Sequence, residues 1–282
     1  MVIDLHTHST ASDGTEPPGV VVAQAAAAGL DVVALTDHDT TGGWDEAADS
    51  ARRHGITLVR GIEVSCSRRG QSVHLLAYLP DPAHPGLVAE LEHARRSRDT
   101  RLERIVAKLA AAGVDVTIEA VRAEVEDGAT AGRPHIADAL VRAGHVADRD
   151  EAFARWLGND RPYYVAHYAP DPVDAVRLVR DAGGVPVIAH PRSVDRGRVV
   201  SDALVEEMTA AGLAGLEVHH RDHGPDAVHH LTGLARSLGL LVTGSSDYHG
   251  DGKANRLGER TTAPEVLEAI EALASGSGVV RA

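Results

Sequence analysis

The sequence has little of what builds a disulfide-stabilised, membrane-spanning or nucleic-acid-coating protein. Its 282 residues contain one cysteine, Cys66, so no disulfide can form within the chain. It has no run of about 18 apolar residues and no basic, apolar leader, so we expect a cytoplasmic protein that does not enter membranes. The 28 basic residues are outnumbered by 41 acidic ones, giving a net charge of −13. A large nucleic-acid footprint is therefore not expected, because neutralising phosphates requires clustered lysines and arginines.

Aromatic residues are also scarce, whereas histidine is abundant. The chain has one phenylalanine, two tryptophans and five tyrosines against 17 histidines. An excess of histidine in such a chain indicates metal chemistry, although histidines scattered over the surface would give the same count. Hydrophobic residues make up 43% of the sequence, enough for the core of one large α/β domain or two small ones.

The first residues contain a candidate metal-binding motif. If residues 2–5 form a strand, its period of two places His6 and His8 on the same side of the strand end. Asp13 follows in a loop rich in Ser, Asp and Gly, where its carboxylate can turn toward the two imidazoles. Nitrogen and carboxylate ligands together suit zinc, manganese or iron better than calcium or magnesium. A surface strand end is the alternative for this motif taken alone.

Apolar runs alternate with helical patterns along most of the chain. This rhythm predicts an α/β fold with parallel strands joined by right-handed crossovers. The expected strands are 2–5, 31–35, 57–64, 73–78, 185–190, 215–219 and 240–243, and the expected helices are 17–29, 44–54, 172–182, 201–211, 225–238 and 264–273.

The alternation stops between residues 85 and 164. A long helix with arginines at exposed positions is predicted to end at Gly113, and shorter helices are predicted near 118–125, 134–143 and 151–157. We therefore expect a barrel made of residues 1–84 and 165–282. Residues 85–164 would form a helical insertion that acts as a lid over the substrate.

Ionisable residues recur where the predicted strands end. In a parallel α/β barrel these ends share one face, where active sites are built. The residues are His6, His8, His38, Glu63, His190, Asp247 and His249. His74 lies within a strand, where a core histidine bonded to the backbone is the alternative. Gly244 and Gly250 flank the last pair and permit tight turns around it.

The motifs together resemble those of the PHP (polymerase and histidinol phosphatase) superfamily. They are His-Thr-His at 6–8, Ser-Asp-Gly at 12–14, Thr-Asp-His-Asp at 36–39, Gly-Ile-Glu at 61–63, His74, Ala-His-Pro at 189–191 and Ser-Asp-Tyr-His-Gly at 246–250. The resemblance covers nearly the whole chain and implies a distorted (β/α)7 barrel with a trinuclear metal centre.

The resemblance also implies how nine residues would share three divalent ions of manganese, iron or zinc. His6, His8, Glu63 and Asp247 would hold one ion. Glu63 would bridge to a second ion held with His74 and His190, and Asp13, His38 and His249 would hold the third. This donor set contains no cysteine and does not distinguish the three metals.

A cluster of divalent ions with open positions suits hydrolysis of a phosphate ester by metal-activated hydroxide. No serine or cysteine with a paired base stands out as a nucleophile, so a covalent intermediate is not required. His223 is our candidate for the acid that protonates the leaving group, with a surface histidine as the alternative.

The helical insertion narrows the range of possible substrates. Gly-Arg-Pro-His at 132–135 resembles a motif of the PHP branch that hydrolyses nucleotides, which implies that Arg133 and His135 clamp a phosphate. Arginine offers a planar fork for phosphate oxygens, although an exposed residue at a helix end is the alternative for Arg133. Arg192 is a second candidate phosphate contact. Members of this branch remove the 3′-phosphate from nucleoside 3′,5′-bisphosphates such as pAp, which is the function we predict here.

Three other functions stay open. A 5′-3′ exonuclease on short oligoribonucleotides would use the same metals and also bind small nucleotide units. Histidinol phosphate phosphatase fits less well, because the Arg-Pro-His insertion is the wrong accessory for that branch. A non-catalytic metal-binding PHP module would tolerate missing ligands, yet every ligand position of the family pattern is filled here.

Overall fold

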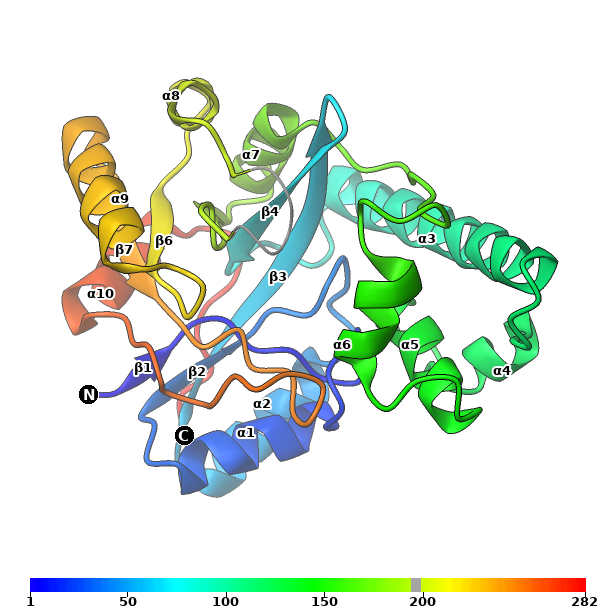
Figure 1. Cartoon of the computed structure of the whole chain (residues 1–282). Coiled ribbons are helices and arrows are strands. Elements are labelled where there is room, and N and C mark those ends of the chain that lie inside the picture. Colours follow the sequence, from blue (N-terminus) through cyan, green and yellow to red (C-terminus); the bar gives the residue numbers. More distant parts are fainter. Residues whose placement is uncertain (194–198) are drawn as a thin grey trace.

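The computed structural model describes residues 1–193 and 199–282, and in these residues seven strands follow one another in chain order around a barrel (Figure 1). The strands are β1 (Ile3–Asp4), β2 (Val32–Leu35), β3 (Thr57–Arg68), β4 (Gln71–Tyr78), β5 (Val185–Ile188), β6 (Gly215–His219) and β7 (Leu241–Gly244). The two ends of the sheet approach each other where Thr7 bridges to Tyr248 and the His8 amide donates to the Tyr248 carbonyl over 2.8 Å. The predicted distorted barrel is confirmed.

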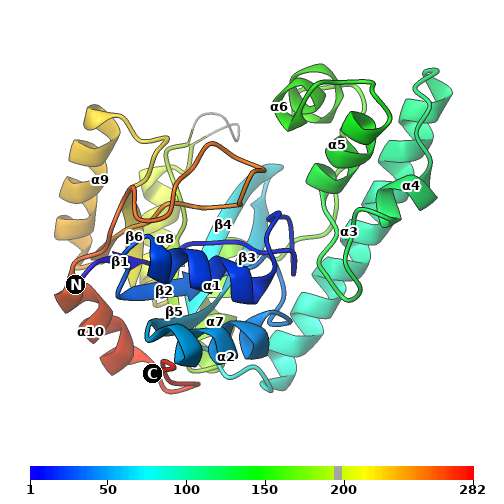
Figure 2. The same cartoon turned by 90° about the horizontal axis from the view of Figure 1, so that it is seen from below.

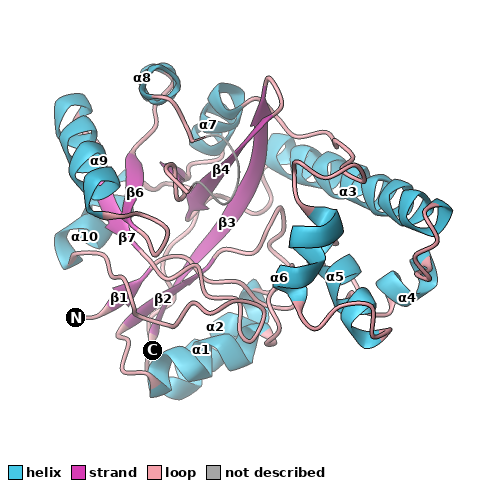
Figure 3. Ribbon diagram, viewed as in Figure 1, coloured by secondary structure: helices cyan, strands magenta, loops and turns pink. Residues whose placement is uncertain are grey.

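Helices cover the outside of the barrel, as Figure 3 shows by colour. They are α1 (Pro18–Ala27), α2 (Trp44–His54), α7 (Pro172–Asp181), α8 (Asp202–Ala210), α9 (Pro225–Leu238) and α10 (Pro264–Leu273). Four of them, α1, α7, α9 and α10, begin at a proline, which has no amide hydrogen to leave unpaired in the first turn. Helix α2 ends at Gly55, whose φ of 69° lies in the left-handed region that glycine adopts without strain.

The strands are apolar on both faces because each face packs against a different cluster. In β2, Val33 and Leu35 pack outward with the helices, whereas Val32 and Ala34 belong to the cluster inside the barrel. The period of two thus separates the two sides of the sheet. The interior cluster fills the end of the barrel where the parallel strands begin, leaving polar side chains at the other end.

Strand β4 departs from the parallel pattern. It pairs antiparallel with both β3 and β5, and only Arg69 and Gly70 separate it from β3. A two-residue loop makes a hairpin and is too short for the crossover that parallel neighbours need. Because the strand direction is reversed, the early part of β4 lies beside the later part of β3, with His74 opposite Ser65. His74 therefore lies at the same end of the barrel as the other candidate ligands.

Residues 85–164, the helical insertion, stand to one side of the barrel (Figures 1 and 2). They contain α3 (Pro85–Ala111), α4 (Ile118–Arg122), α5 (Arg133–Arg142), α6 (Arg149–Ala152) and a π-helical turn, η1 (Phe153–Leu157). These helices pack around a hydrophobic cluster of their own, which includes Ile105, Leu109, Ile136 and Leu140. No helix among the described residues has the length and apolar character needed to cross a membrane.

The insertion is attached to the loops that carry the candidate ligands. The Thr130 amide donates to the Ala11 carbonyl over 2.9 Å, and Arg149 Nη1 donates to the Asp13 carbonyl over 3.0 Å. From α3, Arg98 Nε donates to Asp39 over 2.9 Å. These contacts fix the insertion beside the polar end of the barrel.

Candidate metal centre

The fold brings all nine predicted ligands to one end of the barrel. Inward-facing positions at the strand ends, or in the loops just after them, supply the side chains. Seven are at most 7% exposed, and the other two, Asp13 and His74, are partly buried at the rim. The set is His6, His8, Asp13, His38, Glu63, His74, His190, Asp247 and His249.

Glu63 lies at the middle of the set, and its two oxygens face different imidazoles. Oε2 lies 3.2 Å from His6 Nε2 and 3.0 Å from His8 Nε2. Oε1 lies 2.6 Å from His74 Nδ1 and 3.0 Å from His190 Nε2. This is the arrangement that a carboxylate bridging two ions requires, with a separate pair of imidazoles on each side.

A second group surrounds Asp13. Its Oδ1 lies 3.3 Å from His249 Nε2 and 3.7 Å from His8 Nδ1, and its Oδ2 lies 3.9 Å from His38 Nε2. Donor atoms of these four residues all lie within 4.8 Å of one another. The resemblance assigns His8 to the ion of Glu63, whereas the geometry places its ring between the two groups.

Asp247 closes the first group. Its Oδ1 lies 3.4 Å from both His6 Nε2 and His8 Nε2, while Lys253 Nζ donates to its Oδ2 over 3.0 Å. No sequence motif includes Lys253, which lies in the loop after β7. Its ammonium group reaches the rim of the centre and is one third exposed.

The donor chemistry fits metal ions. His6 Nε2 and His8 Nε2 lie only 3.0 Å apart, and Glu63 Oε2 lies against both. Two buried ring nitrogens with no hydrogen-bond partner also lie in this cluster, His38 Nδ1 and His249 Nε2. Such crowding of buried lone pairs is costly unless cations compensate it. A set of imidazoles and carboxylates is what zinc, manganese and iron prefer.

The protonation of the cluster reflects its carboxylates. Burial lowers the pKa of His8, but hydrogen bonding to Asp247 and Glu63 outweighs burial and raises its pKa to about 9. Burial lowers the pKa of His249 to about 4, with a further contribution from the Lys253 ammonium. Burial raises the pKa of Glu63, but the surrounding imidazoles hold it well below its usual range.

The backbone around the centre is strained at three non-glycine residues. Asp39, His190 and Asp247 have φ values of 52°, 30° and 55°, in or near the left-handed region. Such conformations cost about 1–3 kcal/mol each and persist only where surrounding contacts impose them. At Gly244 the constraint is steric, since a Cβ there would lie 2.5 Å from the Thr261 carbonyl oxygen.

The predicted general acid, His223, and the second predicted phosphate contact, Arg192, both form hydrogen bonds within the protein. His223 is buried, with Nδ1 2.9 Å from the Val218 carbonyl and Nε2 accepting from the Arg192 amide over 3.1 Å. Both ring nitrogens of His223 are therefore bonded to backbone, and its role as the general acid stays a prediction. The Arg192 side chain donates to Asp202 in α8, so its guanidinium is already engaged in an ion pair.

The two predicted clamp residues lie at the start of α5. His135 Nδ1 accepts from the Gly132 amide over 3.0 Å and so caps the helix. Arg133 Nη1 donates to the Leu157 carbonyl and to Asn159 over 2.6 and 2.8 Å. Its guanidinium also lies over the Phe153 ring, 5.4 Å from the centroid. Arg133 is therefore an ordered residue of the insertion rather than an exposed helix end.

Two further arginines and a histidine, which no sequence motif selected, lie near Arg133. Arg101 was expected on an exposed face of the long helix, but it is only 6% exposed and donates through Nε to the Val165 carbonyl over 2.8 Å. Burial, together with the nearby Arg133 and Arg98, lowers the pKa of Arg101 to about 9. His167 Nε2 is buried beside them with no hydrogen-bond partner. We call Arg98, Arg101, Arg133 and His167 the cationic cluster.

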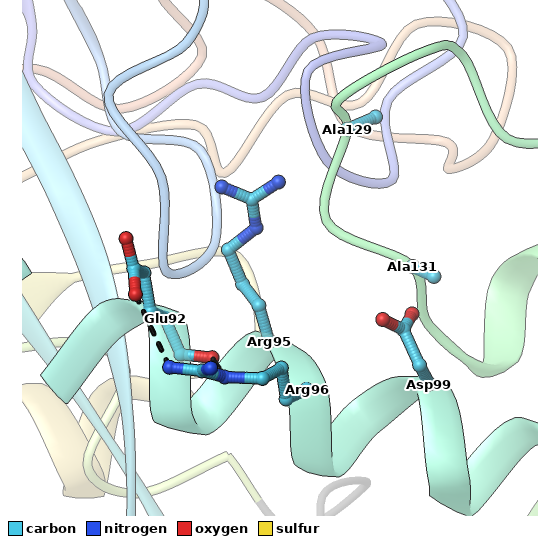
Figure 4. Close-up of a pocket in the computed structure, with 6 residues that line it drawn as sticks. All are labelled: Glu92, Arg95, Arg96, Asp99, Ala129 and Ala131. Atoms are coloured by element: carbon cyan, nitrogen blue, oxygen red, sulfur yellow. Dashed lines mark hydrogen bonds and ion pairs between the residues drawn. The ribbon is translucent and has the colours of Figure 1, made fainter. Parts of the chain in front are cut away.

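A cavity of about 320 Å³ opens against α3, lined by Glu92, Arg95, Arg96, Asp99, Ala129 and Ala131. In Figure 4, Arg95 extends from α3 toward the segment that holds Ala129 and Ala131, while Arg96 pairs with Glu92 on the same helix. Arg95 Nη2 donates to the Gly128 carbonyl over 2.6 Å. The spacing of Arg95, Arg98 and Arg101 at three-residue intervals was the sequence signal for this shared face.

Comparison with known protein families identifies the chain. The PHP domain matches residues 4–148, which include the ligands of the first strands and most of the insertion. The chain belongs to the PHP family. Its fold is also that of a Bifidobacterium adolescentis protein described as a candidate metal-dependent phosphoesterase. The TM-score is 0.94 at 40% identity, and the match covers 97% of this chain and 96% of the other.

Two relatives of this PHP protein have named activities. One is the 3′,5′-nucleoside bisphosphate phosphatase of Chromobacterium violaceum, which is 38% identical over 95% of this chain and 94% of its own length. Another is a 5′-3′ exoribonuclease of Haemophilus influenzae, which is 34% identical over 87% of this chain and 89% of its own length. Both similarities include the barrel and the helical insertion.

Proposed function

We propose that this PHP protein is a phosphoric ester hydrolase that removes the 3′-phosphate from nucleoside 3′,5′-bisphosphates such as pAp. One observation carries the proposal: a buried centre of imidazoles and carboxylates lies beside arginines supplied by the insertion. The centre suits one phosphate and the cationic cluster suits another. The similarity to the bisphosphate phosphatase over nearly the full length supports the same assignment.

We propose that the nine clustered residues hold three divalent ions of manganese, iron or zinc. His6, His8, Glu63 and Asp247 would bind the first, and the Asp13 group the third. Glu63, with His74 and His190, would share the second. Bound divalent ions would lower the pKa of water and screen the charge of the phosphate oxygens.

The residues of the insertion would hold the part of the substrate that does not react. Arg133, Arg101 and Arg98 are fixed by carbonyl, carboxylate and aromatic contacts, so little side-chain entropy is lost when an anion binds. A guanidinium group matches phosphate oxygens in shape and charge. A second phosphate on the substrate would therefore be held at a fixed distance from the centre.

The first experiment compares phosphate release from pAp, AMP, 3′-AMP, histidinol phosphate and a 5′-phosphorylated RNA trinucleotide, each with manganese and with a chelator. We expect manganese-dependent turnover that is fastest on pAp and yields AMP. Preference for 3′-AMP over pAp would contradict the proposal, because it would show that the second phosphate is not used.

A 5′-3′ exoribonuclease acting on short RNA is the second candidate. The cavity against α3 favours it, because Arg95 and Arg96 lie along its wall and could contact a further phosphate of an oligonucleotide. The similarity to the exoribonuclease of Haemophilus influenzae supports the same reading. Release of mononucleotides from the trinucleotide faster than phosphate from pAp would establish this function instead.

A further inference from the structure

Glu217 is a fully buried carboxylate that lies at the centre without belonging to any of the clusters that could hold an ion. It lies on β6 between Leu216 and Val218, which pack outward with the helices, so its side chain faces the barrel interior. Its two oxygens contact two different candidate ligands. Oε1 lies 3.1 Å from His6 Nδ1, and Oε2 accepts from the backbone amide of His190 over 2.7 Å.

The contact with His6 fixes which ring nitrogen faces the centre. A carboxylate beside Nδ1 requires that this nitrogen carry the proton, and the lone pair of the neutral ring then resides on Nε2. Nε2 is the atom that lies 3.2 Å from Glu63 and 3.4 Å from Asp247. Glu217 therefore orients the His6 lone pair into the first candidate ion site.

The contact with His190 acts on the backbone. His190 has a φ of 30°, and a strained residue of this kind needs a fixed contact to hold it. The bond from its amide to Glu217 is short and fully buried. With the backbone so held, His190 Nε2 lies 3.0 Å from Glu63 Oε1, in the second candidate ion site.

We propose that Glu217 is a positioning residue that sets two metal-binding histidines at once, His6 through its ring and His190 through its backbone. This inference rests on the metal centre of the proposed function but does not depend on the substrate. One carboxylate would thus couple the occupancy of the first and second ion sites.

Substitutions that keep either the size or the charge of Glu217 make the proposal testable. Both partners of Glu217 donate hydrogen, so the side chain must accept at both oxygens. In Glu217→Gln only one acceptor oxygen remains, and the amide NH2 group must face either the His6 Nδ1 proton or the His190 amide proton. Glu217→Asp keeps both acceptors and the charge but is shorter by one methylene group, so it should restore part of the function.

The experiment removes metal from the full-length protein and titrates manganese or zinc back against a competing chelator, with bound metal counted by elemental analysis. We expect Glu217→Gln to weaken binding of the first two ions by about 10- to 100-fold, the usual effect of losing a carboxylate that orients a ligand. Excess metal should recover kcat, and KM should be unchanged. Glu217→Asp should fall between Glu217→Gln and the wild type.

Asp171→Asn is the matched control, because Asp171 pairs with Arg68 at the far end of the β3 hairpin and contacts no candidate ligand. It should bind metal as the wild type does. Wild-type metal affinity in Glu217→Gln would overturn the proposal, as would equal weakening in Asp171→Asn. If Glu217→Gln does not fold, Glu217→Asp decides, and wild-type metal affinity in that variant would count against the positioning role.

The metal titration also separates this inference from the proposed function. A wild-type protein that binds metal in a Glu217-dependent manner but does not hydrolyse pAp would support the positioning role and refute the substrate. If the wild type hydrolyses pAp while Glu217→Gln binds metal with wild-type affinity, the substrate assignment is supported and the positioning role is refuted.

Discussion

The barrel and the helical insertion both bury charge, but of opposite sign and by different means. In the barrel, Glu63 and its neighbouring carboxylates are compensated by imidazoles around a space suited to cations. In the insertion, Arg101 is buried and Arg133 is partly buried against carbonyl oxygens and the Tyr164 ring, with Arg98 adding a third positive charge. The barrel thus offers donor atoms of the kind that bind cations, whereas the insertion concentrates positive charge, which favours an anion. A nucleotide with two phosphates would satisfy both regions together.

The largest effect is expected from Glu63→Gln, which keeps the shape of the bridging residue and removes its charge. Loss of the bridge should cost at least about 4 kcal/mol of transition-state stabilisation, or about a thousandfold in kcat on every phosphate ester. Steady-state kinetics and metal analysis test this. Near-wild-type turnover would show that the barrel does not supply the catalytic centre.

Leu140→Ala tests whether the insertion is stabilised separately from the barrel. Leu140 is fully buried in the insertion's own cluster, so truncation should cost about 2–5 kcal/mol of unfolding free energy. We expect faster hydrogen exchange in α3 and α5 with unchanged metal content. Metal loss in parallel would mean that the two regions unfold as one unit.

Arg133→Ala tests the anion side of the comparison. We expect KM for pAp to rise by about 10- to 100-fold, the range for losing a charged hydrogen bond, while kcat/KM for an aryl phosphate is kept. Arg142, at the other end of α5, pairs with Glu124 at the surface and provides the control, since Arg142→Ala should leave both substrates unaffected. Equal losses on both substrates in Arg133→Ala would assign Arg133 to the fold instead.

The smallest effect is the number of protons that the metal centre of the barrel releases when it binds metal. His8 has its pKa raised to about 9, so below that pH the metal-free centre holds a proton that metal must displace. Burial lowers the pKa of His6, but Glu63, Glu217 and Asp247 outweigh burial and raise it well above its usual range. Zinc binding at pH 7 should therefore release protons from this pair, and fewer as the pH rises above about 9. Calorimetry in buffers of different ionisation enthalpy measures this, and release that does not change with pH would contradict the assignment.

Much of the fold was predictable because its signals are local. Helices such as 44–54 and 225–238 were predicted with the bounds found in the structure, since a proline or polar start and a glycine end mark them in the sequence. The direction of β4 was not predicted, although the two-residue connection at Arg69 and Gly70 held the signal. The strand β3 also runs to Arg68, four residues beyond its expected end, because pairing with β4 extends it.

The nine clustered side chains were predictable because strand ends of a barrel converge, so residues far apart in sequence share one site. The burial of the cationic cluster and the backbone bonds of His223 were not predictable. Arg101 has the pattern of a surface residue on a long helix, and only the fold of residues 162–168 over α3 buries it. His223 has the pattern of a free histidine, and only the path of the Arg192 loop shows that both its ring nitrogens are engaged.

The sequence by itself determined the family, the strand and helix rhythm, and the donor atoms of the centre, because these depend on residue type and spacing along a regular backbone. The tertiary structure decided what those residues face. It reversed β4 so that His74 joins the centre, placed His8 between two groups of ligands, and put Glu217 behind both His6 and His190. Such contacts join residues far apart in the chain, as His6 and Glu217 are at 211 positions, and no local pattern records which side chain a barrel will bring opposite another.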